Sequence, residues 1–295
     1  MSLTWSNPII DGNLADPFIL NADGRYWLIA TAVAADGRYL PIYVSDNCQD
    51  WKFVRGAVER GAPGAWNRYN FWAPEILHYQ GQYWLYYTAK PTNDDNNAGN
   101  RVGLAVSDSP AGPYQDCGVL VDHASLDASP FCDADGQLWL YYVTDHGSLR
   151  EYAPGKIWVD RLLSPSQVAD EAKLIVERHG WQEGPVLWPD ERGRYRLTFS
   201  LGCWKDDSYH VAQAVADRPD GPFVESDSII LRSSATVKGP GHHNFFTGPD
   251  GATWIVYHGW DLEMTGRKPR IDPINAGPDG DLVCDGPSSG AVTLP

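Results

Sequence analysis

The stretch Glu183-Gly184-Pro185-Val186-Leu187-Trp188 is one copy of a layout that occurs five times along the chain. A polar residue, often acidic, opens a hydrophobic run, and a glycine turn then leads into a second run that is rich in aromatic residues. In this copy the turn contains Gly193, and the second run is Tyr195-Arg196-Leu197-Thr198-Phe199. A glycine in each turn is typical of a β-hairpin, where positive φ angles are required.

The turn glycines recur at an almost constant interval. They are separated by 57, 55, 57 and 58 residues, and they are Gly24, Gly81, Gly136, Gly193 and Gly251. A regular period of this length indicates a repeat architecture, and it is longer than the roughly 40–45 residues of a WD40 repeat. Short strands between turns, without a long amphipathic helix, indicate an all-β protein.

We therefore predict an all-β fold, a five-bladed β-propeller, whose blades start near residues 14, 71, 125, 181 and 240. The run Val102–Ser107 and the turn that follows it resemble Val211–Val215 and its turn, so these runs are expected to be equivalent strands of blades two and four. The propeller is expected to occupy residues 1–295 as a single catalytic domain. A β-sandwich with chance similarity among its turns is the alternative.

Each repeat opens with a polar residue that is expected to face the central channel. If the first strand of every blade is innermost, these residues point toward one axis. Carboxylates that converge in this way repel one another, and burying them is costly unless they bind something. The central channel is therefore the predicted active site, and its candidate residues are Asp16, Glu75, Asp127, Glu183 and His242.

Several residues near the channel have two interpretations each. Trp72 precedes a strand at the channel mouth and could stack on a sugar ring or pack between blades. An arginine of the segment 266–274 could reach the channel or lie on the surface. His242 and its neighbour His243 stand in a glycine-rich strand start, where a ligand or metal role is as consistent with the sequence as a structural one.

Composition excludes some classes of partner and site. The net charge of −15 argues against a nucleic-acid partner, because phosphate binding needs a basic surface. We recognise no signal peptide and no apolar run long enough to span a membrane. Five cysteines without close spacing indicate reduced thiols rather than a metal site. These features favour a cytoplasmic protein, with secretion as the alternative if a leader has been removed.

Five motifs together resemble glycoside hydrolase family 43, in the family's order and over about residues 7–275. They are Ala15-Asp16-Pro17, Trp72-Ala73-Pro74-Glu75, Leu126-Asp127-Ala128-Ser129-Pro130-Phe131, Glu183-Gly184-Pro185 and Gly239-Pro240-Gly241-His242. The resemblance implies a five-bladed propeller and hydrolysis of an oligosaccharide with inversion. It implies that Asp16 is the general base, that Glu183 is the general acid, and that Asp127 raises the pKa of the acid.

The resemblance also implies binding residues. His242 matches a histidine that, in many members, faces a calcium ion at the channel centre, often through water. Arg267 or Arg270 falls where members place an arginine that contacts substrate, and the resemblance does not choose between them. Trp72 and Glu75 are the other candidates for substrate binding. No organic cofactor is implied.

The family includes β-xylosidases, α-L-arabinofuranosidases and arabinanases. Many of its β-xylosidases carry a C-terminal β-sandwich that this sequence lacks, so the resemblance favours release of L-arabinofuranose from arabinan or arabinoxylan oligosaccharides. A β-xylosidase is the alternative within the family, and an enzyme acting on fructosides fits the motifs less well. A non-catalytic glycan-binding propeller and a protein-interaction propeller are alternatives of other classes. Linkage, exo or endo action and oligomeric state are not determined by the sequence.

Overall fold

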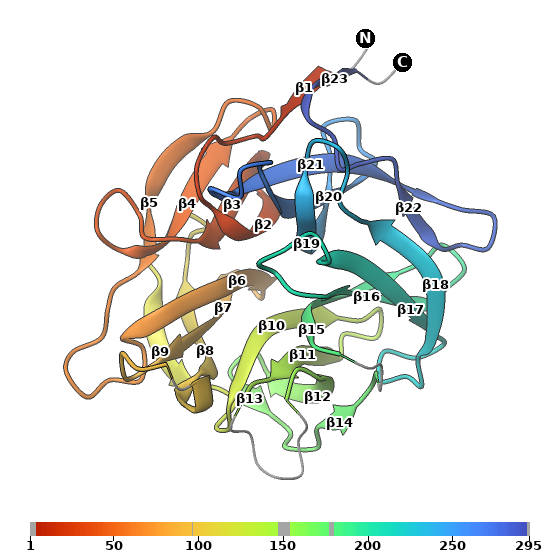
Figure 1. Cartoon of the computed structure of the whole chain (residues 1–295). Helices are drawn as coiled ribbons and strands as arrows, with labels where there is room; N and C mark the ends of the chain where they lie inside the picture. The colour runs from red at the N-terminus through yellow and green to blue at the C-terminus, as the bar shows by residue number, and fades with distance from the viewer. Residues whose placement is uncertain (1–3, 96, 147–153, 177–179, 294–295) are drawn as a thin grey trace.

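A computed structural model describes residues 4–95, 97–146, 154–176 and 180–293 of the chain. Within these ranges the chain forms β-strands and one 3₁₀ turn, η1 (Asn97–Gly99). Five antiparallel sheets surround a central channel (Figure 1). The predicted all-β, five-bladed β-propeller is thus confirmed.

The strands of each blade follow the chain from the channel outward. Blade one consists of β2 (Ala15–Ala22), β3 (Arg25–Thr31), β4 (Tyr39–Ser45) and β5 (Lys52–Val58). Blade two consists of β6 (Tyr69–Tyr79), β7 (Gln82–Lys90), β8 (Arg101–Ser107) and β9 (Gln115–Val119). Blade three consists of β10 (Ser125–Cys132), β11 (Leu138–Thr144), β12 (Ile157–Ser164), β13 (Gln167–Val168) and β14 (Lys173–Leu174).

The last two blades follow the same order. Blade four consists of β15 (Gln182–Pro189), β16 (Tyr195–Leu201), β17 (His210–Ala216) and β18 (Val224–Leu231). Blade five consists of β19 (Lys238–Thr247), β20 (Thr253–Trp260), β21 (Arg267–Ala276) and β22 (Leu282–Cys284). The innermost strands begin within two residues of the predicted blade starts. The third strands of blades two and four, β8 and β17, are the equivalent pair expected from sequence.

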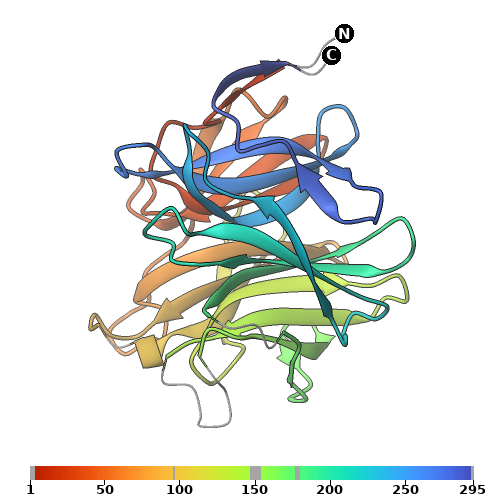
Figure 2. The same cartoon turned by 45° about the vertical axis from the view of Figure 1, so that its right-hand side comes forward.

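The two ends of the chain meet outside the blades. Strand β1 (Thr4–Asn7) pairs with β23 (Gly290–Thr293) at one side of the propeller (Figures 1 and 2). The Trp5 indole donates a hydrogen bond to the Ile271 carbonyl at 3.0 Å and so fixes β1 to blade five. Blade five extends beyond the segment 266–274, because β22 follows it as the outermost strand. Strands as short as β22 and β23 carry too few residues to show a periodic pattern.

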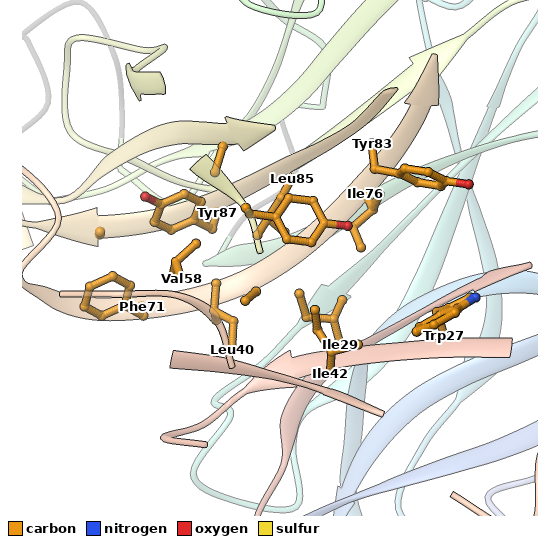
Figure 3. Packing of buried hydrophobic residues seen from close by; sticks show 14 residues of the cluster. Trp27, Ile29, Leu40, Ile42, Val58, Phe71, Ile76, Tyr83, Leu85 and Tyr87 are labelled. Carbon is orange, nitrogen blue, oxygen red and sulfur yellow. The ribbon is translucent and has the colours of Figure 1, made fainter. Parts of the chain in front are cut away.

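The hydrophobic core lies between neighbouring blades. Figure 3 shows the cluster between blades one and two, in which Ile29 and Ile42 pack with Ile76 and Leu85. All four side chains are buried. Successive side chains of a strand point to opposite faces of its sheet, and in a propeller both faces meet a neighbouring blade. The strands therefore read as continuous apolar runs rather than as alternating ones.

Every innermost strand has a β-bulge at the same height, where its pairing register shifts. The first bulge residue has a positive φ angle in each blade, and these residues are Asp16 (50°), Ala73 (46°), Asp127 (55°), Gly184 (51°) and His242 (46°). A bulge re-aims its side chain, which here brings polar groups to the channel. The left-handed conformation costs a residue other than glycine about 1–2 kcal/mol, so its surroundings must hold it.

The bulges correct the predicted alignment of the repeats. Ala73, rather than Glu75, is the counterpart of Asp16 in blade two, and Gly184, rather than Glu183, is the counterpart in blade four. The bulge residues precede the turn glycines by 8, 8, 9, 9 and 9 residues. This spacing is more regular than that of the polar residues predicted to open the repeats. The predicted alignment was wrong because it matched charge, whereas backbone conformation defines the repeat.

Hydrogen bonds between blades hold all five bulges. In four of them the bulge N–H donates to a side chain on the second strand of the preceding blade. The pairs are Ala73 to Thr31 Oγ1 (2.7 Å), Asp127 to Thr88 Oγ1 (3.3 Å), His242 to Ser200 Oγ (2.8 Å) and Asp16 to His258 Nδ1 (3.1 Å). Blade three has Val143 at this position, and the Gly184 N–H donates instead to Asp127 Oδ2 at 3.0 Å.

Candidate active site

A cavity of about 560 Å³ opens at the end of the channel where the bulges lie. Six of the predicted site residues line it, and they are Asp16, Trp72, Asp127, Glu183, His242 and Arg267. They come from all five blades, so the cavity exists only once the propeller has closed. The three carboxylates are supplied by blades one, three and four.

Asp16 lies at the bulge of β2, and its side chain is 8% exposed. Its Oδ1 is 3.4 Å from Arg267 Nη1 and 3.5 Å from His242 Nδ1. Burial by itself would raise the pKa of this carboxyl, but the nearby charges of His242 and Arg267 act in the opposite direction and outweigh burial. The pKa of Asp16 therefore lies well below its usual range, and the group is a carboxylate at neutral pH.

Glu183 lies directly before the bulge of β15 and is held by two donors. The Trp181 indole donates to Oε1 and the Tyr209 hydroxyl donates to Oε2, each at 2.8 Å. Burial raises the pKa of Glu183 to about 7, and the negative charge of Asp16 adds to this effect. The two hydrogen bonds act in the opposite direction because they stabilise the ionised form. Glu183 can therefore carry a proton near neutral pH.

Asp127 lies at the bulge of β10 and lines the same cavity as the other two carboxyls. Burial raises its pKa well above the usual range, and the charges of Glu183 and Asp16 raise it further. The repulsion is mutual, so a charge on Asp127 also disfavours ionisation of Glu183. Asp127 Oδ2 accepts the Gly184 N–H, which fixes this carboxyl beside the residue that follows Glu183.

The site can perform acid–base chemistry. Two carboxyls of one cavity, Asp16 and Glu183, have pKa values displaced in opposite directions. Such a pair supplies an ionised base and a protonated acid at the same pH. Glycoside hydrolysis by two carboxyl groups requires this combination.

Two of the predicted substrate contacts lie outside the cavity. Arg270 is buried and its Nη1 donates to the Ser288 carbonyl at 3.0 Å. Side chains on a strand alternate between its faces, so Arg267 and Arg270 point in opposite directions from β21. Glu75 lies two residues beyond the bulge of β6 and accepts a hydrogen bond from the Ser129 hydroxyl at 2.9 Å. Neither Glu75 nor Arg270 is thus among the residues that line the cavity.

Comparison with known proteins agrees with this geometry. The profile described as "Glycosyl hydrolases family 43" matches residues 5–282. The chain belongs to family 43. It is 29% identical over 291 residues to the β-D-galactofuranosidase xynD of Aspergillus niger, covering 91% of this chain and 80% of that protein. It is 24% identical over 288 residues to extracellular endo-α-(1→5)-L-arabinanase 1 of Bacillus subtilis, covering 89% and 85%.

A solved structure confirms the likeness of the fold. The crystal structure of a thermostable family-43 glycoside hydrolase superimposes with a TM-score of 0.83 at 27% identity and covers 96% of each chain. As a member of family 43, the present chain is a glycoside hydrolase, and its substrate is an oligosaccharide. No helix in the part of the chain that the structure describes is long and apolar enough to cross a membrane.

Among the residues of this family 43 site that were not predicted are Trp181, Trp204, Tyr209 and His258. Trp181 stands two residues before Glu183, so the motif around the acid could have indicated it. Trp204 lines the cavity, and the Arg267 guanidinium lies 4.5 Å from the centre of its ring. Tyr209 and His258 lie far from the motifs in sequence. Only an alignment of the repeats by their bulges would have revealed His258.

Three residues of the family 43 site could hold a cation. Potential ligand atoms of Asp127, Glu183 and His242 all lie within 4.8 Å of one another. Calcium prefers six to eight oxygen ligands, and direct binding to Glu183 would keep this group ionised. A directly bound ion would thus remove the proton that an acid must donate. The donor set fits an ion that is held mainly through water, next to a cluster of carboxylates that attracts it.

Proposed function

We propose that this family 43 hydrolase releases L-arabinofuranose from arabinan or arabinoxylan oligosaccharides with inversion at the anomeric carbon. Asp16 is the general base, Glu183 is the general acid, and Asp127 tunes the pKa of the acid. The observation that carries the proposal is the opposite displacement of the Asp16 and Glu183 pKa values within one cavity.

The chemistry follows from the protonation states. Asp16 takes a proton from a water molecule, whose oxygen then attacks the anomeric carbon. Glu183 donates its proton to the glycosidic oxygen as the bond to the leaving sugar breaks. The step leaves Asp16 protonated and Glu183 ionised, and exchange with solvent restores both. Inversion requires space for the attacking water between the base and the sugar, and non-adjacent blades one and four can provide that space.

The walls of the cavity suit a sugar ring. Trp72, Trp181 and Trp204 line it, and indole faces stack on the apolar faces of sugars. Arg267 lies beside Asp16, and this position supports its role in binding a sugar hydroxyl. These features serve an arabinofuranoside and a xyloside alike, so a β-xylosidase is the alternative. The name of the Bacillus subtilis relative supports arabinan as the substrate.

A β-D-galactofuranoside is a further candidate substrate. The relative from Aspergillus niger is named a β-D-galactofuranosidase. Galactofuranose carries the same furanose ring as arabinofuranose, with one more exocyclic carbon. A site that binds the ring would accept both sugars if the cavity has room for this carbon.

The substrate is identified by an assay on three aryl glycosides, the α-L-arabinofuranoside, the β-xyloside and the β-D-galactofuranoside. We expect turnover to be fastest with the arabinofuranoside and to disappear in Glu183→Ala. Product configuration, read by NMR before mutarotation, is expected to be inverted. Preference for another sugar would replace the arabinose assignment, and retention would refute the mechanism. If none is cleaved, linear arabinan is the next substrate, because an endo-acting enzyme needs an oligosaccharide.

The role of Asp127 is tested by the pH dependence of kcat/KM. In the wild type, kcat/KM is expected to fall above pH about 7 as Glu183 loses its proton. In Asp127→Ala the repulsion is gone, so the pKa of Glu183 is lower and the fall begins at a lower pH. Asp127→Asn, which keeps the shape of the side chain without its charge, should behave in the same way. An alkaline limb that stays in place in both variants would eliminate the tuning role.

Calcium at the channel centre is tested by chelation. We propose that His242 and the nearby carboxylates hold the ion through water, where it offsets their repulsion. Treatment with a chelator is expected to lower Tm, because an ion that binds only the folded state stabilises that state. Calcium should restore Tm, and magnesium serves as the control. No change in Tm or in kcat would argue against a bound calcium ion.

Localisation is a separate question. The Bacillus subtilis relative is called extracellular, which supports the secreted alternative more than the cytoplasmic one. We propose secretion on this ground, and fractionation of the native host would test it.

A further inference from the structure

We propose that His258 is a positioning residue for the base, which holds the backbone of Asp16 so that its carboxylate faces the substrate. This inference rests on the proposed role of Asp16. His258 lies on β20 of blade five, whereas Asp16 lies on β2 of blade one, so the contact spans the closure of the propeller.

The contact between the two residues is direct and buried. The Asp16 N–H donates to His258 Nδ1 at 3.1 Å, and the same nitrogen lies 3.3 Å from Asp16 Oδ1. The His258 side chain is fully buried, and burial lowers its pKa to about 4. A neutral ring that accepts at Nδ1 carries its proton on Nε2, which finds no hydrogen-bond partner among the residues that the structure describes. Burial of an unpaired N–H group is energetically unfavourable, so the presence of an imidazole at this position points to a function for Nδ1.

Comparison among the blades shows what is special about this contact. Thr31, Thr88 and Ser200 occupy the position of His258 in blades one, two and four, and each accepts the bulge N–H of the next blade. A hydroxyl is therefore sufficient to hold a bulge. Blade five uses an imidazole instead, and this larger group also approaches the Asp16 carboxylate.

The imidazole is itself fixed by two rings of the site. It is stacked with Tyr209, at 5.9 Å between ring centres and 9° between planes, and with His242 at 6.2 Å and 27°. The Tyr209 hydroxyl donates to Glu183 Oε2. One packed pair of rings, His258 and Tyr209, thus locates both the base and the acid. The inverting reaction depends on the separation between these two carboxyls.

Loss of the imidazole should release Asp16 from its strained conformation. A left-handed aspartate is unfavourable by about 1–2 kcal/mol, so without its acceptor the backbone can relax. The carboxylate would then turn away from Arg267 and from the attacking water. A displacement of about 1 Å in a reacting group can cost on the order of 10²-fold in rate. Binding of the sugar depends more on other walls of the cavity, so kcat should suffer more than KM.

The test compares His258→Ala with Thr31→Val, measured on the aryl glycoside that the wild type cleaves best. Each variant removes the acceptor of one bulge N–H, but the Thr31 partner is Ala73, which has no reacting group. We expect His258→Ala to lose about 10²-fold in kcat with little change in KM. Thr31→Val should keep kcat near the wild-type value, even if both variants lose a similar amount in Tm.

A conservative variant separates positioning from packing. The side-chain oxygen of His258→Asn can take the place of Nδ1, whereas that of His258→Gln lies nearer Nε2. The Asn variant should therefore recover most of the lost kcat, and the Gln variant should not. Comparison of kcat between the Asn and Gln variants also tests the positioning role if His258→Ala does not fold.

Three results would overturn the proposal. They are a kcat for His258→Ala close to that of the folded wild type, equal losses of kcat in His258→Ala and Thr31→Val, or equal kcat values for the Asn and Gln variants. Failure of the proposed function would look different. In that case Asp16→Ala would retain turnover, whereas failure of the positioning role alone leaves Asp16→Ala inactive and His258→Ala active.

Discussion

Glu183→Ala is expected to lower kcat by about 10²–10⁴-fold, the range for loss of a general acid. The reason is that the leaving oxygen must depart as an alkoxide unless a proton reaches it during bond cleavage. Trp181 and Tyr209 hold the carboxyl in place, and burial keeps its proton near neutral pH. The loss should therefore be largest for natural glycosidic bonds.

The dependence on the leaving group gives this prediction its sharpest form. A dinitrophenyl glycoside has a leaving group that needs little protonation, so Glu183→Ala should cleave it much better than it cleaves an oligosaccharide. Glu75→Gln is the matched control, because burial also raises the pKa of Glu75, to about 8, although this residue does not line the cavity. Equal losses on both kinds of substrate, or a similar loss in Glu75→Gln, would contradict the assignment of the acid.

Asp16→Ala is expected to lower kcat by a similar factor, about 10²–10⁴-fold, because water is a poor nucleophile without a base. Arg267 keeps the Asp16 carboxylate ionised, and the bulge of β2 directs it to the cavity. Kinetics on an activated aryl glycoside would measure the loss. The variant should still bind substrate, since the walls of the cavity are intact.

Azide provides the control for the base. This anion attacks carbon without giving up a proton, so it should restore turnover in Asp16→Ala and form a glycosyl azide of inverted configuration. It should not restore Glu183→Ala on a substrate with a poor leaving group. Substantial turnover of Asp16→Ala in plain buffer would show that another group activates the water.

The repeat, and with it the propeller, could be predicted because its signals are local. Turn glycines and apolar runs depend on residues that are neighbours in sequence, and they recur five times. The placement of Asp16, Asp127, Glu183 and His242 in one cavity followed from the same regularity. The positions of Arg267 and Arg270 could not be predicted in this way, because they depend on which face of β21 points into the channel.

The sequence alone determined the number of blades, the innermost strands and the polar residues that these strands bring to the axis. Only the tertiary structure decided which backbone positions form the bulges, that Glu75 bonds to Ser129 without lining the cavity, and that His258 contacts Asp16. These features arise from contacts between residues up to 242 positions apart. Such contacts form only when blade five packs against blade one, so no local pattern in the chain encodes them.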